Sequence, residues 1–156
     1  MLKKSELDKI TNIVLLLTCF SIASVWGWRQ FGHLLTDFRV GQVVAFDGLV
    51  KGEPALVLGL STKCGFCVAG APTYRKLAAS HRLKILAVFH QPREEGVSFL
   101  TKYDIPVDRV VYMPPMASRI VDTPTVMILD DKHQITHLWK GGLSPDDEKQ
   151  LFALLN

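Results

Sequence analysis

The stretch STKCGFCVAGAP, Ser61–Pro72, places two cysteines two residues apart and a proline shortly after them. It follows the continuous apolar run ALVLGL, residues 55–60, which is typical of a strand buried on both faces. A helix is expected from Cys64 to Ser80. The first cysteine therefore stands where a buried strand gives way to a helix. The pair could be a metal clip, a structural disulfide or a redox couple.

The position of Cys64 favours the redox interpretation. Unpaired N–H groups and the positive end of the helix dipole stabilise a thiolate at a helix start. Lys63 adds a positive charge beside it. One helical turn brings the second sulfur close while burying it more deeply. We therefore expect Cys64 to attack a substrate and Cys67 to resolve the mixed disulfide.

The metal interpretation needs more ligands than the pair supplies. A structural zinc site usually has four ligands. The sequence has no second Cys-x-x-Cys, and His133 and His137 lie across a predicted turn and strand. A permanent disulfide over so short a loop would constrain the unfolded chain little. No metal and no cofactor are therefore expected, although a structural disulfide stays a serious alternative.

Strand and helix signals alternate along the remaining chain, and their order is strand, helix, strand, helix, hairpin, helix. This order predicts a right-handed parallel crossover extended by an antiparallel hairpin. The expected fold class is α/β, with a mixed sheet flanked by helices on both faces. The expected strands are residues 43–47, 55–60, 83–89, 109–113, 125–130 and 134–140, and the expected helices are 64–80, 93–103 and 144–155.

A charge-free apolar run, residues 10–28, lies near the N-terminus. It is about long enough to cross a hydrocarbon core of ~30 Å. Lysines precede it and Trp26 and Trp28 end it, which predicts one transmembrane helix with a cytoplasmic N-terminus. Cys19 is then an apolar residue in the bilayer. A cleaved signal peptide is the alternative.

The expected organisation is therefore a cytoplasmic segment at 1–9, an anchor at 10–28, a connector at 29–42 and an exported domain at 43–156. An exported domain meets an oxidising or redox-managed compartment, where a cysteine pair can cycle. The net charge of +3 and the absence of a dense Lys/Arg stripe argue against nucleic-acid binding.

A second stretch, DTPTVMILDDKHQITHLWKGGLSPDDEKQLFALL, puts Pro124 directly before a buried strand, a hairpin and a closing helix. Together with LVLGLSTKCGFC, it resembles the thioredoxin superfamily, in particular the membrane-anchored TlpA/ResA-like thiol-disulfide oxidoreductases. The similarity covers roughly residues 43–156. It implies a cis peptide at Pro124 beside the dithiol, and a backbone at Thr123 that pairs with a substrate strand. Gly65 and Phe66, between the cysteines, are expected to contact the partner.

The resemblance also implies a function. The chain is expected to exchange disulfides with cysteine-containing protein substrates, with reduction favoured over oxidation and a membrane electron donor as partner. Its location would be the inner (cytoplasmic) membrane, as a single-pass protein with the thioredoxin-like domain on the periplasmic side.

The chain also departs from this family. Lys63 stands where many relatives have tryptophan, and the acid near the buried thiol is missing, because Leu58 and Gly70 occupy the two positions at which relatives carry one. Water or His90, at the end of a buried strand, could accept the proton instead, although a surface role for His90 is favoured. Pro72 matches a proline that kinks the active-site helix in the family.

Two other functions remain open. Met113 and Met116 in YMPPM have a spacing that could supply soft ligands for Cu(I) near the cysteines, although loop methionines that cover the core are the favoured interpretation. The missing acid also leaves room for a non-catalytic docking module that uses the same fold.

Overall fold

The computed structural model describes residues 14–15, 17–21, 37–80, 82–113, 120 and 122–155. The chain divides into two compact units, Met1–Asp37 and Phe38–Asn156. In the first unit, residues 14–15 and 17–21 are helical. Most of the expected anchor and connector lies outside the described residues. Among the residues described, no helix combines the length and the apolar character needed to cross a membrane.

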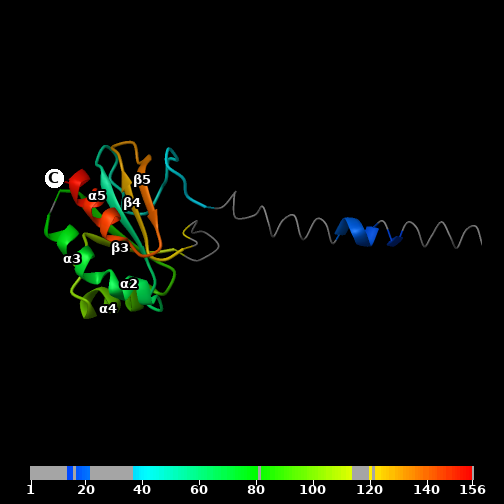
Figure 1. Cartoon of the computed structure of the whole chain (residues 1–156), viewed down its shortest axis with the longest axis horizontal. Coiled ribbons are helices and arrows are strands. Elements are labelled where there is room, and N and C mark those ends of the chain that lie inside the picture. The colour runs from blue at the N-terminus through cyan, green and yellow to red at the C-terminus, as the bar shows by residue number, and fades with distance from the viewer. Residues whose placement is uncertain are drawn as a thin grey trace, which may run out of the picture. The chain divides into compact units, whose positions relative to one another are not determined.

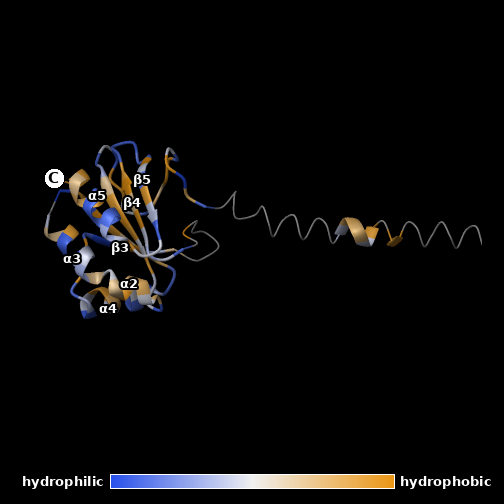
Figure 2. Ribbon diagram, viewed as in Figure 1, coloured by the Kyte–Doolittle hydropathy of each residue, from blue (hydrophilic) through white to orange (hydrophobic). Residues whose placement is uncertain are grey.

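The second unit is built on a five-stranded sheet in the order β3-β2-β1-β4-β5 (Figure 1). Strand β1 (Ala55–Leu60) pairs in parallel with β2 (Lys84–Phe89), which pairs in parallel with β3 (Arg109–Tyr112). Strand β4 (Thr125–Leu129) runs antiparallel to β1 and to β5 (Ile135–Lys140). The predicted mixed sheet is therefore confirmed. Figure 2 shows apolar residues concentrated in the central strands, and all six residues of β1 are buried.

The helices all pack on one face of this sheet, so the prediction of helices on both faces is wrong for the described chain. Their buried side chains form one cluster with Leu56, Leu58 and Leu60 of β1. Successive right-handed crossovers that advance in one direction, from β1 to β2 to β3, leave their helices on the same face. The helices are α2 (Gly65–Ala69), α3 (Ala71–Ala79), α4 (Arg93–Lys102) and α5 (Pro145–Leu155).

The opposite face is covered by the chain that precedes β1. Phe38, Val44 and Phe46 are buried there and cluster with Val57 of β1 and Met127 of β4. The rings of Phe38 and Phe46 meet edge to face, with their centroids 5.8 Å apart. Phe38 belongs to the expected connector, yet it forms part of this core.

The predicted strand at 43–47 is wrong, because only Val43 makes an isolated bridge, to Gln134. Gly41 and Gly48 flank this stretch with φ of 89° and 102°. Such positive φ values turn the backbone away from an extended path. Backbone hydrogen bonds join this part of the chain to the start of β5, from the Gly41 N–H to the Ile135 carbonyl at 2.8 Å and from the Val44 N–H to the His133 carbonyl at 3.0 Å, but they form no continuous strand.

The predicted helix at 64–80 is two helices that meet at Gly70. Pro72 lies in the first turn of α3 and lacks the N–H that a continuous helix would need there. The Gly70 N–H still donates to the Phe66 carbonyl at 2.9 Å, and the Tyr74 N–H donates to the Gly70 carbonyl at 3.1 Å. The kink that the resemblance implied is therefore present as a one-residue interruption at Gly70, between α2 and α3.

Gly96 provides a stability test of this packing. A Cβ atom at Gly96 would lie 2.8 Å from the ring of Phe89, which is fully buried. Alanine normally favours a helix interior over glycine by about 1 kcal/mol. Overpacking instead costs about 1–3 kcal/mol, so we expect Gly96→Ala to lower the free energy of unfolding in urea of the full chain, followed by circular dichroism. Val97→Ala, at a side chain 43% exposed on the same helix, should change it by about 0.5 kcal/mol or less. A more stable Gly96→Ala variant would contradict this packing.

Candidate active site

Cys64 is the N-cap residue of α2, with φ of −98° and ψ of 113°. The backbone N–H of Cys67 donates a hydrogen bond to Cys64 Sγ at 3.1 Å. Because α2 has only five residues, this direct N–H donor is the main local support for negative charge on the sulfur, ahead of the dipole of a long helix.

A loop from the far end of the sequence reaches the same sulfur. The Thr123–Pro124 peptide is cis, as the resemblance implied. The Cys64 thiol donates a hydrogen bond to the Thr123 carbonyl at 3.2 Å. The Pro124 carbonyl accepts from the Gly141 N–H at 2.8 Å, and the Thr125 hydroxyl donates to the Asp122 carbonyl. These bonds fix the loop against the end of β5 and hold it beside the first cysteine.

Cys67 differs sharply from its partner, since its side chain is fully buried while Cys64 is partly exposed. Burial, reinforced by the hydrogen bond with Cys64, raises the pKa of the Cys67 thiol to about 12. Hydrogen bonds with the Ser61 backbone and the Thr123 side chain oppose this rise. The two cysteines are free thiols in the structure. One sulfur is thus accessible and the other is held protonated beneath it.

Gln91 braces the loop that carries Cys64, a role that sequence reasoning missed. Its side-chain N–H donates to Ser61 Oγ at 3.0 Å, and its carbonyl accepts from the Thr62 N–H at 3.4 Å. Gln91 follows β2, and the carboxyl ends of parallel neighbouring strands meet at one edge of a sheet. The sequence signal that could have identified this role is a polar residue two positions after the second buried strand.

The residues between the cysteines face outward. Phe66 is 68% exposed, and it packs beside Gly142, where an added Cβ would lie 3.2 Å from the Phe66 ring. Gly65 is exposed, and a Cβ added there would meet no atom within 4 Å. Lys63 is also exposed. The surface around Cys64 therefore presents an uncovered aromatic ring beside an open glycine.

His90, considered as a proton acceptor for the buried thiol, contacts two backbone carbonyls instead. One ring nitrogen lies 3.1 Å from the Met113 carbonyl and the other 2.9 Å from the Ile120 carbonyl. Both nitrogens thus face backbone oxygens, so His90 holds these two segments and is not placed to accept the thiol proton. Met116 of the possible copper site lies outside the described residues. In the part of the chain that is described, no group of three or more His, Cys, Asp or Glu side chains could hold a metal ion.

The two positions that lack an acid are filled in different ways. Leu58 is fully buried in the helical face of the core. Gly70 is covered by Tyr74, because a Cβ at Gly70 would lie 2.6 Å from the Tyr74 hydroxyl. Sequence reasoning missed Tyr74, although its position four residues after Gly70 on a predicted helix places the two on one face.

Comparisons with solved structures agree with this geometry. The chain aligns with the thioredoxin domain of a thiol-disulfide oxidoreductase from Bacteroides vulgatus at 18% identity and a TM-score of 0.56, covering 77% of this chain and 100% of that one. StoA from Bacillus subtilis aligns at 17% identity and a TM-score of 0.56, over 76% and 96%. A secreted disulfide oxidoreductase from Mycobacterium tuberculosis, homologous to E. coli DsbE, aligns at 18% identity and a TM-score of 0.54, over 67% and 81%.

The chain has the thioredoxin fold. At these identities the likeness concerns the fold. No protein-family model matches the sequence, and no curated protein is significantly similar to it.

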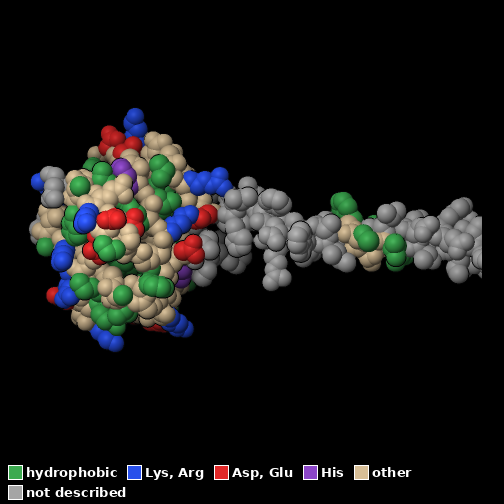
Figure 3. Space-filling model, in the orientation of Figure 1, with side chains coloured by type: hydrophobic (Ala, Val, Ile, Leu, Met, Phe, Trp, Pro, Cys, Tyr) green, Lys and Arg blue, Asp and Glu red, His purple; other side chains and the backbone are tan. Residues whose placement is uncertain are grey.

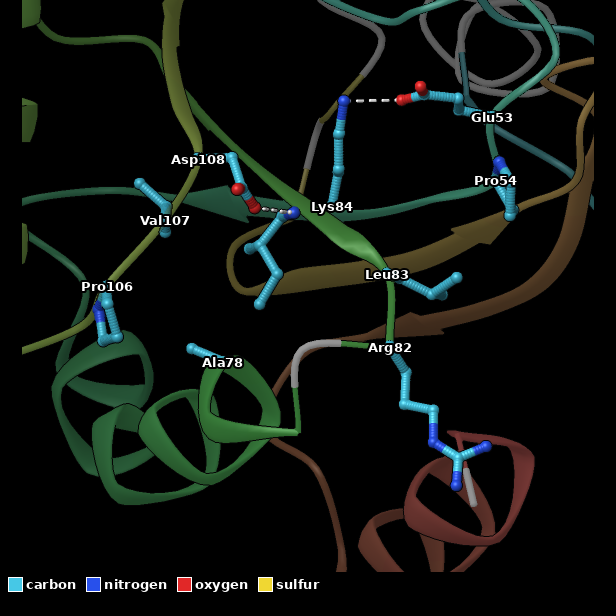
Figure 4. Close-up of a pocket in the computed structure, with 10 residues that line it drawn as sticks. Glu53, Pro54, Ala78, Arg82, Leu83, Lys84, Pro106, Val107 and Asp108 are labelled. Carbon is cyan, nitrogen blue, oxygen red and sulfur yellow. Dashed lines mark hydrogen bonds and ion pairs between the residues drawn. The ribbon is translucent and has the colours of Figure 1, made fainter.

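A cavity of about 500 Å³ lies at the opposite end of the sheet from Cys64 (Figure 4). It lies at the starts of β1 and β2. Several of its charged groups already have partners: Lys84 pairs with Glu53 at 2.6 Å, and Asp108 accepts from the Ile85 N–H at 2.7 Å. Charged side chains of both signs are interspersed on the described face in Figure 3, with no extended basic patch there. The cysteine pair therefore remains the candidate site.

The raised pKa of Cys67 can be tested by alkylation. In Cys64→Ser, on a Cys19→Ser background, iodoacetamide should modify Cys67 at least about tenfold more slowly at pH 8 in the folded chain than in urea, because burial, the largest cause of the raised pKa, stays in this variant and leaves little of the reactive thiolate. The folded rate should rise about tenfold per pH unit up to about pH 10. Mass spectrometry measures the modified fraction. Equal rates in folded and unfolded chains at pH 8 would show that Cys67 is neither buried nor suppressed.

Proposed function

We propose that the chain is a membrane-anchored, extracytoplasmic oxidoreductase that exchanges disulfides with cysteine-containing protein partners through Cys64 and Cys67. The observation that carries the proposal is the arrangement of the dithiol. An accessible thiol contacts both the N–H of Cys67 and the carbonyl before a cis-proline, and a buried second thiol lies one helical turn away.

The reaction proceeds in two exchanges. The Cys64 thiolate attacks one sulfur of a substrate disulfide, forms a mixed disulfide and expels the other substrate sulfur as a thiolate. Cys67 then attacks Cys64 Sγ, which closes the Cys64–Cys67 disulfide and releases the second substrate sulfur. Two electrons pass to the substrate, each released thiolate takes up one proton, and the protein is left oxidised.

The Thr123 carbonyl gives this site a way to bind an extended substrate. When both cysteines are reduced, the Thr123 carbonyl accepts a hydrogen bond from the Cys64 thiol. When Cys64 ionises, this hydrogen bond is lost and the half-buried carbonyl can accept from another donor. A backbone N–H from a substrate strand is such a donor. Phe66 and Gly65 then offer the strand an apolar ring and room for close approach.

The sequence supports the anchor, and the resemblance to TlpA/ResA-like proteins favours reduction over oxidation. The apolar run at 10–28 with its flanking lysines and tryptophans favours a single-pass anchor in the cytoplasmic membrane, with the dithiol on the periplasmic side. Because the reaction consumes two electrons per substrate disulfide, a reductant placed there needs a membrane electron donor. A reductant should have a potential near the thioredoxin end of the range, ~−270 to −200 mV, whereas an oxidant lies near ~−120 mV.

Insulin reduction with dithiothreitol tests the assigned cysteines. Cys64→Ser should lose the activity because no accessible thiolate remains. Cys67→Ser should accumulate mixed disulfides, visible on non-reducing gels, because nothing resolves them. Cys19→Ser removes the third cysteine of the chain and should leave activity unchanged. Full activity in Cys64→Ser would sink the proposal.

A redox titration against glutathione and dithiothreitol measures the reduction potential of the cysteine pair and so distinguishes a reductant from an oxidant. A potential in the thioredoxin range supports the reductant, and a value close to −120 mV on the scale of known oxidants would reverse the direction. A pair that is reduced only when the chain unfolds would make the disulfide structural.

A further inference from the structure

The resolving thiol faces a chemical difficulty. Cys67 is fully buried, and burial holds the pKa of its thiol far above neutrality. Yet the thiolate is the form that attacks a disulfide. A buried thiol can be ionised during turnover only if nearby donors stabilise the charge as it develops. Hydrogen bonds with the Ser61 backbone and the Thr123 side chain already lower the pKa of Cys67, yet that pKa stays raised. The question is which further group near Cys67 serves.

Tyr74 is a buried polar side chain in the right place. It is 1% exposed and belongs to the same core cluster as Cys67. Its hydroxyl lies over Gly70, where an added Cβ would be only 2.6 Å away. Gly70 ends α2 and lies three residues after Cys67, so the hydroxyl sits over the helical turn that follows the buried sulfur. The missing side chain at Gly70 makes the room for it.

The surroundings keep the Tyr74 phenol protonated. Burial is the largest cause that raises the pKa of Tyr74, followed by the negative charges of the two cysteines when they ionise. The carboxylate of Glu148, on α5, acts in the same direction. That carboxylate is itself fixed by a hydrogen bond from the Thr73 hydroxyl, next to Tyr74 on α3. A phenol that keeps its proton beside a developing thiolate is a hydrogen-bond donor, since ionised acceptors strengthen such bonds.

We propose, on the basis of the function proposed above, that Tyr74 is a positioning residue for the resolving step, whose hydroxyl donates a hydrogen bond to Cys67 as this sulfur ionises. In that step the Cys67 sulfur bonds to Cys64 Sγ, the bond between Cys64 and the substrate sulfur breaks, and the Cys67 proton ends on the released substrate thiol. Tyr74 keeps its own proton throughout.

The test follows the two exchanges separately with the aromatic disulfide DTNB, in the full chain on a Cys19→Ser background. Attack by Cys64 releases one coloured thiolate, and attack by Cys67 on the mixed disulfide releases the second. Tyr74→Phe should leave the first phase unchanged and slow the second at least about tenfold at pH 7. Its second phase should also reach a given rate only at a higher pH than in the unsubstituted chain.

Two further variants separate this role from a packing role. Gly70→Ala keeps the phenol but puts a methyl group where its hydroxyl lies, so it should slow the second phase as well. Tyr103→Phe removes a hydroxyl from a tyrosine that packs on Phe99, with ring centroids 4.8 Å apart, and should change neither phase. Urea unfolding of each variant confirms that the compared chains are folded.

The outcomes are distinct. If the unsubstituted chain shows no first phase, the proposed function itself fails. If both phases are present and folded Tyr74→Phe matches the unsubstituted chain in rate and pH profile, the role of Tyr74 is overturned while the function stands. If Tyr74→Phe slows the second phase without displacing its pH profile, Tyr74 is only a packing residue and the inference is likewise overturned.

Discussion

The hydrogen bond from the Cys64 thiol to the Thr123 carbonyl joins two parts of the chain that are 59 residues apart in sequence. One is the turn after β1, and the other is the loop before β4. Because β1 and β4 are adjacent antiparallel strands, the end of one lies beside the start of the other. The sheet order therefore brings the cysteine and the cis-proline loop to one edge, and the remaining site features follow from that placement.

The two thiols at this edge of the sheet differ in their exposure to solvent. A single turn of α2 separates them, yet this turn points one sulfur to the surface and the other into the cluster beneath the sheet. The environment of each sulfur suits a different half of a disulfide exchange. In the proposed exchange the accessible sulfur would attack the partner, and the enclosed sulfur would stay protonated until the mixed disulfide forms beside it. An enclosed thiol also avoids unwanted reactions with solutes, since the reactive thiolate is scarce.

Much of this was predictable from local patterns. The continuous apolar runs identified β1 and β2, and Ser144 with Pro145 marked the start of α5, because these signals depend on nearby residues alone. The side of the sheet that each helix covers depends on the direction of successive crossovers, which a list of elements does not give. Tyr74 escaped notice for a similar reason. The role proposed for it depends on the space left by Gly70, and a missing side chain has no signature of its own in a sequence.

The chain before β1 has a further consequence. Phe38, Val44 and Phe46 cover part of the sheet face that the helices leave bare, together with Ile120 from the loop before β4. A shortened chain that starts at residue 43 would lose Phe38 and its edge-to-face partner contact, and would expose part of the lining over Met127. The end of the expected connector is thus part of the hydrophobic core, and the compact unit begins at Phe38 rather than at residue 43.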